Sequence, residues 1–145
     1  MSKEKKMNKN KTLLLIKPDA MKKKIIGKII SMLEQNDINI IQMKILKLNK
    51  LQAKAFYNDH KNKNFYSELI EFMTSYNITA LILQTENSDV IQCVRTLIGD
   101  TDYTMAKKNT IRYKFATSLT KNVVHASDSI VSYIKENDII FNDKY

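Results

Sequence analysis

Short apolar runs alternate along this chain with stretches of helical periodicity, and this alternation limits the folds open to it more than any other feature. Residues 12–16 form a compact apolar run that Pro18 stops, as expected for a buried strand. Apolar residues then recur at helical spacing from Ile25 to Leu33, which predicts an amphipathic helix that ends near Asn36. Such an alternation predicts an α/β or α+β protein with one core.

The same patterns predict the remaining elements. Further strands are expected over residues 38–48, 79–83 and 112–118, and further helices over residues 51–60, 66–76, 90–98 and from about residue 127. Ser88 is the expected N-cap of the helix over residues 90–98, Gly99 its C-terminal stop, and Ser127 or Asp128 the N-cap of the last helix. Residues 100–112 lack periodicity and are predicted to form a long loop, of a length at which loops are usually functional.

Length and charge indicate one folded domain with a basic tail. The 145 residues are too few for two domains with proper cores, so we expect a disordered extension over residues 1–10 and one domain over residues 11–145. The net charge is +9, but residues 1–11 hold five lysines and one glutamate, a net of +4. A solvated tail plus compositional bias therefore explains the charge better than a nucleic-acid surface does.

Scarce residue types exclude several kinds of site. Cys93 is the single cysteine, which excludes an intramolecular disulfide framework and a cysteine-based zinc cluster. The two histidines, His60 and His125, are too far apart in sequence for a local His-rich metal site. No signal peptide or membrane span is predicted, because the apolar run over residues 13–16 is far shorter than the roughly 20 residues a span needs. We expect a soluble, cytoplasmic protein.

His125 is the candidate nucleophile. A lone histidine is more often structural, but this one precedes a predicted helix start, where free backbone N–H groups favour an incoming negative charge. A neutral imidazole there could attack phosphorus. Glu136, about three helical turns further on, could fix the tautomer of the ring, although from spacing alone an exposed helix charge is the better explanation.

The arginines point to phosphate. Among 24 lysines and arginines only Arg95 and Arg112 are arginine, which suggests that these two positions need the guanidinium itself unless they are a chance survival. Its planar fork binds phosphate oxygens in a bidentate way. The long loop would bring both together, and Lys17, at the end of a buried strand, is a third candidate cation. The sequence has no glycine-rich phosphate loop, so side chains must do this work.

Residues 11–141, which contain all of these candidates, resemble the nucleoside diphosphate kinase family. The run over residues 12–19 is similar to the family's opening strand with its K-P-D signature, and residues 122–129 to its N-x-x-H-G-S-D-S motif. The segments 99–101 and 110–112 fall at matching separations. The segment 57–60, with Phe65 after it, resembles the family's Y-x-x-H-x-x-x-P-F segment.

The resemblance implies ping-pong transfer of a γ-phosphoryl group from a nucleoside triphosphate such as ATP to a nucleoside diphosphate. His125 would carry the group as phosphohistidine, with Glu136 orienting the ring and Ser127 close by. The phosphates would be bound by Lys17, Arg95, Thr101 and Arg112. Asn122 would contact the sugar 3′-hydroxyl, and Phe65 and Leu119 would stack on the two faces of the base. Tyr57 would lie near the histidine. His60 is expected to be an exposed helix residue.

The resemblance also implies a cofactor, a fold and an assembly. Mg²⁺ would bridge phosphate oxygens and contact the protein mainly through water, with Asp128 the nearest carboxylate. The implied fold is α+β: a ferredoxin-like β-α-β-β-α-β core whose four-stranded antiparallel sheet is covered by helices. A homohexamer is favoured and a homotetramer is the alternative, with neither a membrane nor nucleic acid as partner.

Some positions depart from the family pattern. Ala126 stands where the motif has glycine, which matters if a positive φ is required there, and Asn109 also replaces a glycine. Asn64 and Tyr103 replace prolines, so loop rigidity and subunit contacts could differ.

Two other function classes stay open: a non-catalytic nucleotide-binding relative and a basic nucleic-acid-binding protein. The intact phosphate-handling set argues against the first, since binding alone needs no nucleophile, and the uneven charge distribution argues against the second.

Overall fold

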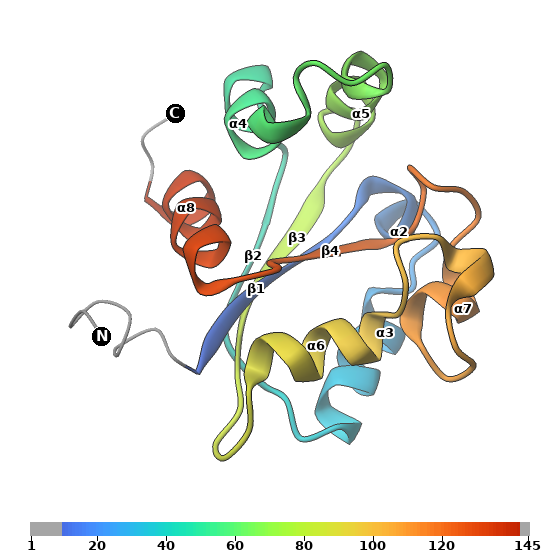
Figure 1. Ribbon diagram of the computed structural model, residues 1–145, viewed down its shortest axis with the longest axis vertical. Coiled ribbons are helices and arrows are strands. Elements are labelled where there is room, and N and C mark those ends of the chain that lie inside the picture. The colour runs from blue at the N-terminus through green and yellow to red at the C-terminus, as the bar shows by residue number, and fades with distance from the viewer. Residues whose placement is uncertain (1–9, 143–145) are drawn as a thin grey trace.

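The computed structural model describes residues 10–142, which form a four-stranded sheet with helices on both faces (Figure 1). The strands are β1 (Lys11–Ile16), β2 (Asn39–Leu46), β3 (Ile78–Gln84) and β4 (Val124–Ala126). Their order is β2-β3-β1-β4 and every neighbouring pair is antiparallel, which confirms the predicted α+β fold with its ferredoxin-like sheet. Apart from residue 10, the predicted basic extension lies outside the described residues.

The predicted helices are present, together with two short helices that the sequence patterns did not predict. The helices are α2 (Pro18–Lys22), α3 (Ile26–Gln35), α4 (Lys50–Phe56), α5 (Tyr66–Met73), α6 (Val90–Ile98), α7 (Ile111–Phe115) and α8 (Ile130–Phe141), with short 3₁₀ turns η1 (Asn58–His60) and η2 (Tyr103–Met105). In Figure 1, α4, α5 and α8 lie on one side of the sheet and α3, α6 and α7 on the other. None of the helices within residues 10–142 is long and apolar enough to cross a bilayer.

Strand β1 is apolar from Leu13 to Ile16 because both of its faces are covered. Leu13 and Leu15 pack with α4, α5 and α8, whereas Leu14 and Ile16 pack with α3 and α6. All four side chains are fully buried. Burial of each contributes about 1.5–3 kcal/mol, so this strand anchors both layers and fixes the position of what pairs with it.

The predicted strand over residues 112–118 is wrong. Helix α7 occupies Ile111–Phe115, and Thr110 caps it by accepting a hydrogen bond from the Tyr113 N–H at 3.3 Å. The fourth strand is β4, which has only three residues and pairs with β1. Three residues are too few to show the periodicity of a strand, so the segment becomes a strand only through its pairing with β1 in the tertiary structure.

The predicted N-caps are also wrong. Asp89 rather than Ser88 caps α6, and Ser129 caps α8. Ser127 and Asp128 are engaged elsewhere, with the side chains of Glu136 and Ser132 respectively. Gly99 does end α6, with φ of +88°, and a Cβ atom there would lie 2.6 Å from Thr110 Oγ1, so the turn requires glycine.

The two glycine replacements have different backbone settings. Asn109 has φ of +70°, a conformation that asparagine tolerates better than most residues. Ala126 lies in β4 without a positive φ, and its methyl group packs into the core beside α6. The alanine therefore strains nothing at this position.

Candidate active site

The candidate site is built on β4, at one edge of the sheet. His125 lies opposite Leu15 of β1. The Lys17 N–H donates to the Val123 carbonyl at 2.9 Å, and the Ser127 N–H donates to the Leu13 carbonyl at 3.1 Å. Because main-chain groups alternate along an antiparallel ladder, the carbonyls of Val124 and Ala126 point away from β1, toward the free edge.

Two arginines occupy that free edge. Arg112 donates from Nη2 to the Val124 carbonyl at 2.9 Å and from Nη1 to the Gly99 carbonyl at 3.0 Å. Arg95 donates from Nη1 to the Ala126 carbonyl at 3.5 Å. Burial and the nearby charge of Arg95 lower the pKa of Arg112 to about 10, so it stays a cation at neutral pH. Two guanidinium groups thus flank His125 along the strand.

His125 itself is held by a carboxylate. Its Nε2 lies 3.0 Å from Glu136 Oε1, and Ser127 Oγ donates to the same oxygen at 2.7 Å. A carboxylate can only accept, so Nε2 carries the proton and Nδ1 presents its lone pair. Within residues 10–142 no hydrogen bond occupies Nδ1. The expectation of a helix start beside His125 is wrong, because the histidine lies within a strand and α8 begins at Ile130.

Lys17, Asn122 and Thr101 form a second cluster. Lys17 Nζ donates to Asn122 Oδ1 at 2.8 Å and to the Thr120 carbonyl at 3.2 Å, while Asn122 Nδ2 donates to the Thr101 carbonyl at 3.4 Å. Burial, with the charge of Arg112, lowers the pKa of Lys17 to about 8. This ammonium group is therefore available for an anion at neutral pH but loses its proton more easily than a surface lysine.

A row of rings leads away from His125. Its ring packs edge-on against Phe56 (4.9 Å between centroids) and lies 6.1 Å from Tyr57. Burial, together with the charge of Glu136, raises the pKa of Tyr57, and its hydroxyl is buried with no partner among the described residues. His60 continues the row, 6.3 Å from Tyr57 and 5.5 Å from Phe65.

The expectation that His60 is an exposed helix residue is wrong. The side chain is half-buried between two rings, and burial lowers its pKa. Its neighbour Phe65 is 44% exposed and Leu119 is 64% exposed. Both candidates for contact with the base therefore lie on the surface of the protein.

Asp128 lies beside this site at the entrance to α8. Its Oδ1 accepts a hydrogen bond from Ser132 Oγ at 2.6 Å, which lowers the pKa of the carboxyl group. The described residues contain no cluster of three or more histidine, cysteine or acidic side chains that could hold a metal ion.

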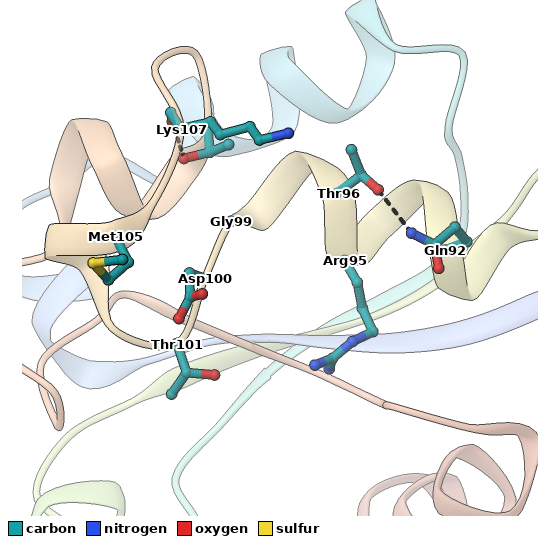
Figure 2. A pocket seen from close by; sticks show the side chains of 9 residues that line it. Gln92, Arg95, Thr96, Gly99, Asp100, Thr101, Met105 and Lys107 are labelled. Atoms are coloured by element: carbon teal, nitrogen blue, oxygen red, sulfur yellow. Dashed lines mark hydrogen bonds between the residues drawn. The ribbon is translucent and has the colours of Figure 1, made fainter.

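A polar hollow of about 410 Å³ adjoins the strand edge (Figure 2). Arg95 and Thr101 line it and point to the same side of α6. The other lining residues are Gln92, Thr96, Gly99, Asp100, Met105, Lys107 and Thr110. His125 and Lys17 are not among them, so the hollow lies next to the histidine rather than around it.

Three residues of the site carry no role in the sequence-based prediction. Phe56 packs against His125, and Asp19 accepts a hydrogen bond from the Val123 N–H at 3.1 Å. Asp19 had a sequence signal, since it is the last residue of the K-P-D signature at residues 17–19. Phe56 and Val123 had none, because both read as ordinary core residues.

The comparisons with known proteins agree on one family. The family model for nucleoside diphosphate kinase matches residues 10–145. The nucleoside diphosphate kinase of Histophilus somni is 45% identical over 130 residues, covering 90% of this chain and 91% of that protein. That of Staphylothermus marinus is 45% identical over 137 residues, covering 94% and 96%.

A solved structure shows the same relationship in three dimensions. The Aquifex aeolicus nucleoside diphosphate kinase superposes with a TM-score of 0.86 at 40% identity, covering 91% of this chain and 94% of that one. A sequence match over nearly the whole chain and a shared fold therefore coincide. This chain belongs to the nucleoside diphosphate kinase family.

Proposed function

We propose that His125 is the residue that carries the phosphoryl group in this kinase. The activity of the family is γ-phosphoryl transfer from a nucleoside triphosphate to a nucleoside diphosphate through a phosphohistidine. One observation carries the assignment: Glu136 holds Nε2 at 3.0 Å, which leaves Nδ1 as the free nucleophilic atom. The two arginines bond the main-chain carbonyls on either side of this histidine.

In the first half-reaction, the Nδ1 lone pair forms a bond to the γ-phosphorus. The bond from that phosphorus to the β,γ-bridging oxygen breaks, and its electron pair leaves with the nucleoside diphosphate. The ring becomes positively charged, and the Glu136 carboxylate at Nε2 stabilises that charge. Ser127 donates to the same carboxylate oxygen and so fixes its orientation.

The second half-reaction reverses the first with another nucleotide. A terminal oxygen of the bound nucleoside diphosphate attacks the phosphorus, the P–N bond breaks, and the electron pair returns to Nδ1. The imidazole is regenerated in its starting tautomer because Nε2 keeps its proton throughout. The protein therefore supplies a nucleophile, position and charge, which is what phosphoryl transfer chiefly needs.

The phosphates would be held by Lys17, Arg95, Arg112 and Thr101. Both arginines are fixed by main-chain carbonyls, and a guanidinium group has further N–H donors for phosphate oxygens. Lys17 is fixed by Asn122, whose side chain would in turn reach the sugar 3′-hydroxyl. Their charges would be in place before substrate arrives, so little reorganisation accompanies binding.

The base would lie against Phe65, with Leu119 on its other face and Tyr57 between this region and His125. Stacking accepts any base, so broad specificity is expected. The half-buried ring of His60 backs Phe65 at 5.5 Å and supports the use of Phe65 as a platform.

Enzymes of this family depend on Mg²⁺ in general, and this site fits an ion that arrives with the nucleotide. Asp128, with its lowered pKa, is an ionised carboxylate suited to contact such an ion through water. When bound, Mg²⁺ would supply positive charge that offsets the negative charge of the phosphates.

Labelling with [γ-³²P]ATP tests the nucleophile directly. The protein should take up label that is acid-labile and base-stable and that any nucleoside diphosphate removes. His125→Ala should take up none, and Lys108→Ala, which removes an exposed cation outside the site, should label normally. Label that survives in the His125→Ala protein would refute the assignment, and no label in the unaltered protein would refute the function.

We also propose that the protein acts as a homo-oligomer, with a hexamer favoured over a tetramer. Strand β2 is an edge strand of the sheet, and its apolar side chains Ile41, Met43 and Ile45 are 46%, 50% and 59% exposed. An exposed apolar edge strand suits a protein–protein contact. Light scattering should give the mass of six chains, and Ile45→Lys should lower it.

A cytoplasmic location is part of the same proposal. It rests on the single free thiol, Cys93, which suits a reducing compartment. Fractionation of the source cells would test it.

A further inference from the structure

The turn that leads into β4 has an unusual backbone. Val123 has φ of +68°, although it is β-branched and fully buried. The Val124 N–H donates to the Asn122 carbonyl at 2.9 Å, which closes a three-residue γ-turn centred on Val123. A β-branched residue rarely adopts such a φ, so surrounding contacts must hold it there.

Those contacts come from one short segment at the end of β1. Asp19 Oδ2 accepts the hydrogen bond of the Val123 N–H at 3.1 Å, and the Lys17 N–H donates to the Val123 carbonyl at 2.9 Å. Both main-chain polar groups of Val123 are thus tied to the segment 17–19. Asp19 is only 7% exposed, and its Oδ1 is buried without a partner among the described residues, so within this part of the chain the Val123 N–H is the hydrogen-bond partner of its carboxylate.

The turn stands between two residues of the proposed site. Asn122 precedes Val123 and holds Lys17 Nζ at 2.8 Å. His125 follows two residues later, but it is fixed separately, by pairing with Leu15 and by Glu136. Relaxation of Val123 to a negative φ would therefore rotate Asn122 away and leave His125 in its place.

We propose that Asp19 is a positioning residue: by holding Val123 in its turn, it keeps Asn122 and Lys17 placed for the nucleotide. Asp19 does not touch the reacting atoms. This inference rests on the proposed function, because it assumes that Asn122 and Lys17 bind the sugar and phosphates. It predicts that loss of Asp19 affects nucleotide-dependent steps and spares the reactivity of His125 itself.

Two phosphoryl donors separate these effects. Labelling of His125 by ATP needs the whole site, whereas phosphoramidate has no base or sugar and gives its phosphoryl group to the imidazole with loss of ammonia. Asp19→Ala should slow labelling by ATP about 10²-fold, the size of effect expected from a small misplacement, and raise the KM for nucleotides. Labelling by phosphoramidate should stay at the rate of the unaltered protein.

A matched pair of variants distinguishes position from charge. Asp19→Asn keeps an oxygen that accepts the Val123 N–H but removes the charge beside Lys17, so it should restore labelling by ATP. If Asp19→Asn is as slow as Asp19→Ala, charge rather than position explains the residue and the proposal is overturned. Asp89→Ala removes another aspartate that accepts a backbone N–H, that of Gln92 at the start of α6, and should change both labelling rates equally.

A second background protects the test against simple unfolding. Glycine adopts a positive φ readily, so in a Val123→Gly protein the turn no longer needs its restraint. Asp19→Ala should then slow labelling by ATP much less than it does beside Val123. An equal loss in both backgrounds, or an equal loss with both donors, would overturn the proposal, whereas absence of label in the unaltered protein would overturn the proposed function instead.

Discussion

The two ends of the proposed nucleotide site are built differently. At the phosphate end, Lys17, Arg112 and Asn122 are 6%, 6% and 2% exposed, and each is hydrogen-bonded to other protein groups. At the base end, Phe65 is 44% exposed and Leu119 is 64% exposed. Arg95 and Thr101, the other two phosphate-binding candidates, are exposed, so the contrast with the base end rests on the buried residues Lys17, Arg112 and Asn122.

This difference matches what each end has to do. A phosphoryl group must lie in line with Nδ1, so the charges around it gain from being fixed before substrate binds. A base needs only an apolar face to stack on, and a loosely held face accepts purines and pyrimidines alike. Rigid phosphate binding and permissive base binding can thus coexist in one domain.

Replacing Arg112 by lysine should have the largest effect. A lysine cannot hold both the Gly99 and Val124 carbonyls and still offer a fork to phosphate, so kcat/KM should fall by about 10³-fold. Leaving one of these carbonyls unpaired should also cost about 1–3 kcal/mol of stability. Steady-state kinetics and denaturant unfolding measure the two effects.

Lys114→Ala is the control for Arg112→Lys, since it removes an exposed cation from the same helix, α7. It should leave both quantities near their original values. If Arg112→Lys lowers kcat/KM less than Phe65→Ala or Leu119→Ala does, the phosphate-binding groups are not fixed before substrate binds.

The pH dependence of kcat/KM should reveal Lys17. Since kcat/KM reports the free enzyme and the pKa of Lys17 is lowered to about 8, nucleotide capture should decline as pH rises above about 8, by up to about tenfold per unit. A Lys17→Met protein should start lower and show no such decline. Activity that stays constant to pH 9.5 in the unaltered protein would contradict the assignment.

Lys17 also makes the free energy of unfolding depend on pH. Because folding lowers the pKa of this group, the free energy of unfolding changes with pH in the opposite direction from that expected for a group whose pKa folding raises. The folded-state pKa of Lys17, about 8, lies below the ordinary value of 10.5, so between these values the unfolded chain binds more protons. Stability relative to Lys17→Met should therefore rise with pH across this window and be lowest below pH 8. Urea unfolding of both proteins at several pH values measures the difference.

At the base end, Phe65→Ala should raise the KM for every nucleotide about fivefold, which corresponds to about 1 kcal/mol of lost stacking. The value of kcat should hardly change, because the ring is remote from phosphorus. Purine and pyrimidine substrates should be affected alike. A large fall in kcat would show that the row of rings from Phe65 to His125 also affects the chemical step at His125.

Leu119→Ala should have the smallest effect. The side chain is 64% exposed, and exposed substitutions usually stay within about 0.5 kcal/mol. The KM should change by less than about twofold for all bases. A strong preference for one base in this variant would show that Leu119 discriminates between bases.

Much of the fold was predictable because burial imposes periodicity. Residues 12–16 and 79–83 are apolar on both faces, and the stripe from Ile25 to Leu33 covers one side of the sheet, so each pattern pointed to its element. The pattern failed at residues 112–118, which form α7, and at β4, whose three residues have no room for a pattern.

Within the site, the sequence alone determined the chemical inventory: one well-placed histidine, two arginines among many lysines, and a buried lysine before Pro18. Only the tertiary structure decided how they meet, because the contacts that matter join residues far apart in the chain. Glu136 reaches Nε2 only when α8 packs beside β1, the arginines find main-chain carbonyls only because β4 is an edge strand, and Asp19 meets Val123 only across the end of the sheet. Spacing along a chain carries no information about such contacts, since strand pairing and packing set them.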